Sequence, residues 1–246
     1  MVRTSRSGRL TTLAPPLVLA WIGLAVVIHA MRSSSTSLPD EFLTYERVFS
    51  SLRRHLELVG VSSMGALVVS FPLGALLTRL QADRMEATIV KLLSIAQTVP
   101  GIAILGLSMG VLGLGFKTAV FALWLHALLP ILHNTISGIR GVDRKIVEVA
   151  RGMGMRADRI FFKVELPLGA PVVVGGVRTA VVYNVGSAAL GTFVGAGGLG
   201  DLIVTGLALH RMPILITGSV LTALLAVFSD FLLGEVEFRL NPGRSV

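Results

Sequence analysis

The side chains of this 246-residue sequence that could carry chemistry are polar residues set within long apolar segments. Gln97, Asn134 and Asn184 each lie in such a segment. A side-chain amide at membrane depth can bind a passing solute, because it offers both donors and an acceptor. It can equally hydrogen-bond a neighbouring helix, and the sequence leaves both uses open. Cysteine is absent, which excludes disulfides, thiolate nucleophiles and cysteine-held zinc.

A glycine-rich stretch follows one of the apolar segments. Its spacing, Gly-x-Gly-x-x-Gly, matches a dinucleotide fingerprint, but that fingerprint needs a preceding strand and a βαβ unit, and here an apolar helix is expected instead. We expect the glycines to bend the chain at the extracytoplasmic end of a membrane span. A gate or binding-protein contact and a purely structural turn both stay open. The residues concerned are Gly195, Gly197, Gly198, Gly200 and Asp201.

His126 and His133 are a second pair that could suggest a site. They are seven residues apart and would share a helix face. No Asp, Glu or Cys accompanies them in that segment, and metal sites usually need three or four ligands. We interpret both histidines as structural, and we expect no metal.

Composition places these residues in a membrane protein. Hydrophobic residues make up 53% of the sequence and charged residues only 15%, with a mean hydropathy of +0.79, which is outside the range of soluble domains. Six apolar runs approach or exceed the ~20 residues that cross a bilayer; they cover 10–31, 58–78, 92–116, 118–139, 179–200 and 212–229. Arginines precede the first run as in a signal peptide, but no trusted cleavage pattern follows, so we expect a retained span.

The distribution of basic residues predicts the orientation. With the N-terminus in the cytoplasm, sixteen of the twenty-two Lys and Arg residues fall on the cytoplasmic side, as the positive-inside rule requires. Residues 143–167 then form a cytoplasmic loop. The net charge of +8 is explained by this topology and by anionic lipid, and we expect no nucleic-acid partner, since the basic residues are scattered among loops without interleaved aromatics.

The remaining segments are short connections. Residues 33–40 predict a solvated link, and residues 41–55 have apolar side chains at helical spacing, which indicates an interfacial helix leading into the second span. We divide the chain into a first part, residues 1–44, with the basic tail and first span, and a transmembrane domain, residues 45–242. No soluble domain is expected.

The cytoplasmic loop has the pattern of a helix-turn-helix. Asp143 is a candidate N-cap, and Gly154 is suited to the positive φ that ends a helix. A second helix is expected over about 157–164, with Pro167 stopping it. The apolar side chains of the first helix recur at i, i+3, i+4 and i+7, which predicts one face free for docking; they are Ile146, Val149, Ala150 and Met153.

The same loop resembles the EAA loop of ABC importer permeases. That motif is Glu-Ala-Ala, three residues, Gly, nine residues, then Ile-x-Leu-Pro, and the spacing matches here in full, with Val149 and Val164 as conservative departures. In the family this loop is where the membrane subunit docks on its ATPase. The resemblance therefore implies an ATPase-coupling role for six residues: Glu148, Ala150, Gly154, Val164, Leu166 and Pro167.

Other stretches resemble one branch of these importers, the permeases for glycine betaine, choline, carnitine and related osmoprotectants. They begin at Gln97 (Gln-Thr-Val-Pro-Gly), at Leu129 (Leu-Pro-Ile-Leu-His-Asn-Thr) and at Gly195 (Gly-Ala-Gly-Gly-Leu-Gly-Asp). The resemblance covers about residues 45–242. An extra N-terminal span and His133 depart from the family pattern. The expected translocation path uses Gln97, Pro100, Asn134 and Asn184.

The resemblance implies an all-α permease with a five-helix core plus one extra span, in the bacterial cytoplasmic membrane. It also implies a separate cytoplasmic ATPase that binds ATP and Mg²⁺, a second permease copy or homologue, and an extracytoplasmic binding protein. No cofactor is expected in this chain, which has no Walker A sequence and is no enzyme itself. Aromatic residues amount to only 6%, so we expect the binding protein to supply most of the selectivity.

Three other functions are weighed against this one. A permease for methionine-like or phosphonate-like solutes would share the loop. A secondary carrier or channel would explain the hydropathy but not the loop, and the spans lack the rows of carboxylates or arginines that such carriers show. A small membrane enzyme would need a convergent set of catalytic groups, which the sequence does not indicate.

Overall fold

The structure is a computed structural model that describes residues 18, 21–23, 25–29, 43–80 and 82–241. The elements in residues 43–241 are all helical. The predicted first span and the link after it lie largely outside the described residues. In chain order the elements are α2 (Tyr45–Arg79), α3 (Asp83–Thr98), α4 (Gly101–Leu112), α5 (Phe116–Arg140), α6 (Arg144–Gly152), α7 (Ala157–Ile160), a π-helical turn (Phe161–Glu165), α8 (Leu166–Ser187), a 3-10 segment (Ala188–Val194), α9 (Leu199–Ala208) and α10 (Met212–Leu240).

Four helical stretches of the described chain are long and apolar enough to cross a membrane. They are α2, α5, the continuous stretch Ala157–Val194 and α10. A fifth crossing is formed if α3 and α4 count as one span, since together they also meet the test. The predicted all-α membrane fold is confirmed, with four to five candidate spans in place of the five expected after the first.

The predicted span over 92–116 is not one continuous helix, because the chain bends by 100° between α3 and α4. The bend falls at Val99 and Pro100. Proline lacks an N–H and disfavours a helical conformation for the residue before it, and Val99 is accordingly extended, with ψ 126°. Pro100 then begins α4 as its N-cap residue. Only α3, with 16 residues, runs along the bundle.

Two other predicted boundaries are corrected. The expected interfacial helix over 41–55 and the second span form one unbroken helix, α2, of 35 residues. The fifth span begins well before residue 179, because the helical chain runs without a break from Ala157 to Val194. In the first case the helical spacing of the apolar side chains in 41–55 runs on into the span, and in the second a π-helical turn carries α7 into α8.

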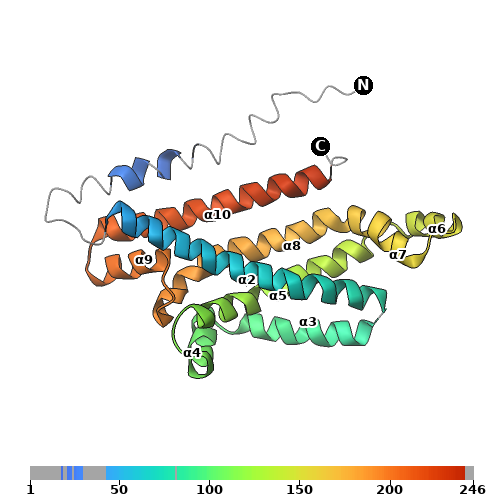
Figure 1. Cartoon of the computed structure of the whole chain (residues 1–246), viewed down its shortest axis with the longest axis horizontal. Helices are drawn as coiled ribbons and strands as arrows, with labels where there is room; N and C mark the ends of the chain where they lie inside the picture. The colour runs from blue at the N-terminus through green and yellow to red at the C-terminus, as the bar shows by residue number, and fades with distance from the viewer. Residues whose placement is uncertain (1–17, 19–20, 24, 30–42, 81, 242–246) are drawn as a thin grey trace.

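The centre of the bundle is made by α2, α5 and α8, with α10 on the outer side of α8 (Figure 1). Buried aliphatic and small side chains from the three central helices fill this core, among them Ala66, Ile131 and Ala180. Gly138 and Gly169 lie where α5 crosses α8, and a β-carbon on Gly169 would collide with the carbonyl of Gly138. Such small-residue contacts let membrane helices approach closely without a hydrophobic driving force between them.

An ion-pair network joins α8 to α10. Arg178 donates two hydrogen bonds to the carboxylate of Asp230, at 2.6 and 2.7 Å, and a third to Glu237 at 3.2 Å. Gly234 leaves the space that the guanidinium occupies. The bidentate geometry between Arg178 and Asp230 orients as well as neutralises the two charges.

The two ends of the bundle differ in character (Figure 1). One end carries α6 and α7, the beginning of α3 and the end of α10, whereas the other carries α4 and α9. The loop predicted to be cytoplasmic therefore lies at the opposite end from the glycine-rich stretch predicted to be extracytoplasmic.

Candidate functional site: the cytoplasmic loop and the path

The first half of the loop is a short helix with defined ends. The Asp143 carboxylate accepts a hydrogen bond from the backbone N–H of Lys145 at 2.9 Å, which confirms the predicted N-cap. At the other end Gly154 has φ +79°, also as predicted. The backbone N–H of Met155 donates to the carbonyl of Ala150 at 3.2 Å and closes the turn. These contacts define both ends of α6, a helix of nine residues.

The second half of the loop differs from the prediction. Pro167 does not stop a helix; α7 passes through the π-helical turn into α8 without a break. The ring lies in the first turn of α8, where a missing N–H costs little. The wider π turn just before it absorbs the steric conflict that a proline creates with the preceding turn. The loop is therefore a helix-turn-helix whose second helix continues into a candidate membrane span.

The six residues predicted for ATPase coupling occupy three environments. Glu148, Gly154 and Pro167 are exposed, and Val164 and Leu166 are half-buried. Ala150 is 3% exposed and packs inward from α6. A side chain larger than a methyl group at position 150 would push α6 away from the second half of the loop. Ala150 therefore acts by letting the two halves of the loop pack together, not by contacting the ATPase.

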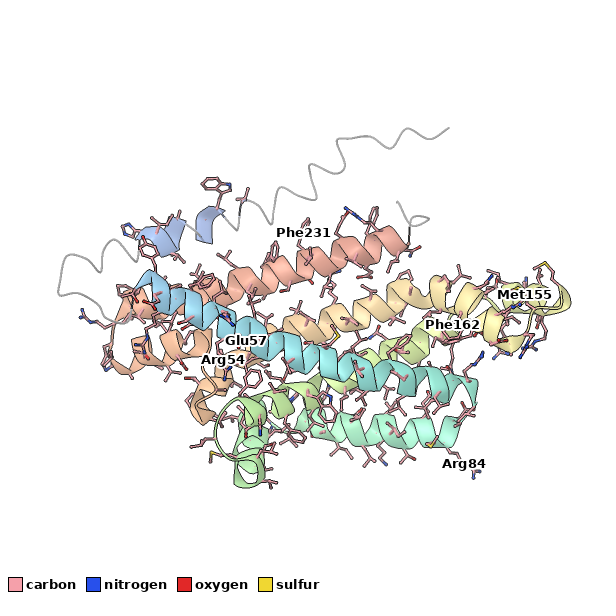
Figure 2. The ribbon with its side chains drawn as sticks, viewed as in Figure 1. Arg54, Glu57, Arg84, Met155, Phe162 and Phe231 are labelled. Carbon is pink, nitrogen blue, oxygen red and sulfur yellow. The ribbon has the colours of Figure 1, made fainter. Side chains whose placement is uncertain are left out.

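An unpartnered apolar surface covers the outside of the loop. The exposed fractions are 46% for Ile146, 62% for Val149, 70% for Met153 and 65% for Phe162. Three of these four lie on the predicted amphipathic face of α6, and Phe162 extends the face from the second half of the loop. We call these four residues the docking face. It lies at the far end of the molecule, where Met155 marks the tip of the loop (Figure 2).

The polar residues predicted for the path are dispersed rather than gathered. Gln97 ends α3 and donates to the carbonyl of His126 at 3.0 Å, and Pro100 forms the bend beside it. Asn134 bonds the carbonyl of Pro130 one turn back in its own helix, at 2.8 Å. Asn184 is fully buried and lies elsewhere. Of the four residues predicted for the path, only Gln97 and Pro100 lie together, at the bend between α3 and α4.

Asn184 makes interhelical contacts. Its amide nitrogen donates to the hydroxyls of Ser62 and Ser63 at 3.1 and 3.0 Å. These bonds join α8 to α2 inside the bundle, which is the second of the two uses that the sequence left open for such amides.

The glycine-rich stretch is a tight turn that several elements hold. We call residues 195–198 the glycine turn; Gly195, Gly197 and Gly198 all have positive φ. Gly200 follows in α9 and lies so close to the carbonyl of Ala189 that a β-carbon would collide with it. Asp201 accepts a hydrogen bond from Thr192 across the turn. The five predicted residues thus belong to one compact structure, whose glycines are required by backbone geometry.

Comparison with known families decides what this architecture belongs to. Residues 70–242 match the family described as the binding-protein-dependent transport system inner membrane component. The chain belongs to this family. It is therefore the permease, a multi-pass inner-membrane component of an ABC transporter whose ATPase is a separate subunit.

Several characterised permeases are similar over most of their length. The carnitine transport permease protein OpuCD of Listeria monocytogenes is 40% identical over 79% of this chain and 87% of its own. The choline transport system permease protein OpuBB of Bacillus subtilis is 39% identical over 82% and 88%. The osmoprotectant import permease protein OsmY of Salmonella typhimurium is 40% identical over 77% and 80%.

Solved structures share the fold of the permease. The MetNI methionine ABC transporter, in its inward-facing conformation, matches with a TM-score of 0.70 and 23% identity, covering 79% of this chain and 96% of that one. An amino acid ABC transporter with histidines matches with a TM-score of 0.65 and 17% identity, covering 78% and 93%. At these identities the likeness concerns the fold alone.

Sequence reasoning missed one residue of the small cavity beside the bend between α3 and α4. Tyr183 is 47% exposed, and its ring stacks on His126 with centroids 5.4 Å apart. Gly101 and Ser187 line the same small cavity, directly behind the bend between α3 and α4. The sequence feature that could have identified Tyr183 is its position next to Asn184, as an aromatic residue in a span with few aromatic residues. His126, which was interpreted as structural, positions that ring.

Proposed function

We propose that the permease imports quaternary-ammonium osmoprotectants, such as glycine betaine, choline and carnitine, at the expense of ATP hydrolysed by its partner. The observation that carries the proposal is the identity with permeases named for carnitine and choline, over nearly their whole length. The EAA-like loop adds the means of coupling. The methionine transporter resembles the chain only in fold, and therefore does not favour methionine.

The docking face supports a helix-in-groove contact with a cytoplasmic ATPase. An exposed apolar surface of this kind at the tip of a loop indicates a protein partner. It is bordered by Arg144, Lys145 and Arg151, all exposed, so an acidic rim around the groove of the ATPase would complement it. The partner would hold ATP and Mg²⁺. A second permease copy or a homologue would complete the membrane part, and an extracytoplasmic binding protein would deliver the solute.

The path would pass the bend between α3 and α4. A quaternary ammonium has no N–H to donate, so an aromatic face is the neutral group best suited to it. Tyr183 offers such a face. The carboxylate of a betaine needs a donor, and the side-chain amide of Gln97 has a second N–H besides the one bonded to His126. We expect these groups to select the class of solute, while the binding protein selects the individual compound.

The orientation proposed for the permease has its N-terminus and coupling loop in the cytoplasm. The absence of cysteine makes single-cysteine labelling clean. Met155→Cys at the loop tip should react only with a reagent admitted to the inside of sealed vesicles. Leu114→Cys, 72% exposed between α4 and α5, should react only from the outside. The reverse pattern would overturn this orientation.

The test of the substrate is uptake into proteoliposomes that contain the permease, its ATPase and its binding protein. Labelled carnitine, choline and glycine betaine should enter with ATP, and methionine should neither enter nor compete. ATP-dependent uptake of methionine that the three osmoprotectants leave unaffected would overturn the substrate assignment while keeping the coupling loop.

A further inference from the structure

Helix α2 connects the two functional ends of the permease. It has 35 residues in one helix, about 52 Å at 1.5 Å per residue. Pro72 lies within it without breaking it. Figure 1 shows α2 running along the bundle, from the end near α9 to the end where α3 begins. An unbroken helix of this length transmits displacement because its backbone bonds resist stretching.

At the cytoplasmic end, α2 holds the second half of the coupling loop. Arg79, the last residue of α2, donates from Nη1 to the carbonyl of Ala157 at 2.8 Å. Its guanidinium also lies 4.9 Å from the ring centroid of Phe161, which is 7% exposed. Ala157 begins α7 and Phe161 begins the π-helical turn. Arg79 therefore holds the segment through which the loop continues into α8.

At the opposite end, His55 fastens α2 to α8 and to Leu199, the residue that directly follows the glycine turn. His55 is fully buried. Its Nε2 lies 2.9 Å from the carbonyl of Val185, and its Nδ1 accepts a hydrogen bond from the backbone N–H of Leu199 at 3.3 Å. A neutral ring protonated on Nε2 satisfies both contacts. The side chain thus joins the end of α8 to the start of α9.

Arg54 adds a second attachment at this end. Its Nε donates to the carbonyl of Ala196, inside the glycine turn, at 3.0 Å. The guanidinium lies 4.3 Å from the ring centroid of Phe116 at the start of α5. Glu57, one turn along α2, accepts from Arg54 at 3.2 Å and steadies it; both are labelled in Figure 2.

We infer that α2 transmits movement of the coupling loop to the glycine turn, with Arg79 as the input and Arg54 with His55 as the output. The inference rests on the proposed function, since it supplies the mechanical route between ATPase and extracytoplasmic gate. Two of these hydrogen bonds, from Arg79 to Ala157 and from Arg54 to Ala196, join a guanidinium of α2 to a backbone carbonyl. A movement of either backbone segment would therefore move α2 with it. A route along α8 alone would need neither attachment.

The first test removes the input. Arg79→Ala should lower the solute transported per ATP hydrolysed at least about fivefold, the lower range of allosteric coupling. Arg79→Lys should recover part of the ratio, because lysine keeps a donor for the carbonyl. Arg84→Ala is the matched control. Arg84 points away from the bundle (Figure 2), and within the described part of the chain its side chain makes no hydrogen bond or ion pair; its backbone carbonyl accepts one from the hydroxyl of Thr88.

The readout separates coupling from folding and from the proposed function. Both rates are measured on purified, reconstituted complexes that hydrolyse ATP, so a misfolded variant is not counted. A wild-type ratio in Arg79→Ala would overturn the inference. Absence of ATP-driven uptake in the wild type would instead overturn the proposed function, whatever the variants do.

The second test asks whether the two ends belong to one route. Arg54 and Arg79 are 25 residues apart in α2, about 37 Å along its axis, and independent sites at such a distance have additive effects. We expect the double variant Arg54→Ala/Arg79→Ala to lose no more coupling than the worse single variant. Arg53→Ala is the control at this end, since Arg53 is 75% exposed and pairs with Glu57. Additive losses would contradict a single route through α2.

Discussion

Replacing Gly154 by alanine tests how the coupling loop is held in shape. Gly154 has φ +79°, and nothing lies within 4 Å of the position of an added β-carbon. The substitution therefore introduces backbone strain without a steric clash. The left-handed conformation costs about 1–2 kcal/mol for a residue with a β-carbon, which corresponds to a roughly five- to thirty-fold larger population of the opened turn.

Hydrogen–deuterium exchange of the permease in lipid nanodiscs measures this population. The amides of Gly154 and Met155, which donate to Arg151 and Ala150, should exchange faster by the same factor. Gly152→Ala is the matched control: Gly152 lies two residues away in α6, also with open space around it, and alanine there favours the helix by up to about 1 kcal/mol. Equal exchange in the Gly154→Ala variant and the wild type would refute the role of the positive φ, as would equally fast exchange in the control.

Three further predictions address coupling, stability and the path. The Gly154→Arg variant should still assemble with the ATPase, which co-purification measures. It should transport less solute per ATP hydrolysed, because a bulky charged side chain then lies beside the docking face. Normal uptake by this variant would contradict the coupling role of the loop. Asp230→Asn should lower the unfolding free energy by about 1–2 kcal/mol, because it removes the negative charge and one of the two oxygens that accept from Arg178. Glu235→Gln, in an exposed i,i+4 pair with Arg239, should cost at most about 0.5 kcal/mol. Thermal unfolding in detergent compares the two variants, and equal melting temperatures would disprove the difference. Tyr183→Ala should raise the KM for carnitine by about twofold to thirtyfold, because it removes a cation–π contact of about 0.5–2 kcal/mol. Tyr183→Phe keeps the aromatic ring and should keep the wild-type KM. An unchanged KM in Tyr183→Ala would show that Tyr183 is not part of the path.

The cytoplasmic loop was the part of the structure that the sequence predicted best. Its N-cap, its apolar spacing and the positive φ of Gly154 depend on residues close together in the chain, so local pattern determines them. The bend at Pro100 is also local, but hydropathy averages over a window and reports a straight span across it. Pro167 was misjudged because a π-helical turn, which sequence pattern does not reveal, accommodates the proline.

The path and the contacts of α2 could not be predicted in the same way. Asn184 bonds Ser62 and Ser63 from more than a hundred residues away, so its use depends on which helices pack together. His55 and Arg54 contact Val185, Leu199 and Ala196, which are more than 120 residues away in the chain, so these contacts depend on how the helices pack. Tyr183 gains its place from His126 on another helix.

The most direct test of ATP-driven import is carnitine accumulation in proteoliposomes that contain the permease, its ATPase and its binding protein, with and without hydrolysable ATP on the side of the coupling loop. We predict accumulation above the outside concentration only with ATP, and its loss when the ATPase is left out. Equal entry of carnitine without ATP or without the ATPase would contradict it and indicate an ATP-independent carrier.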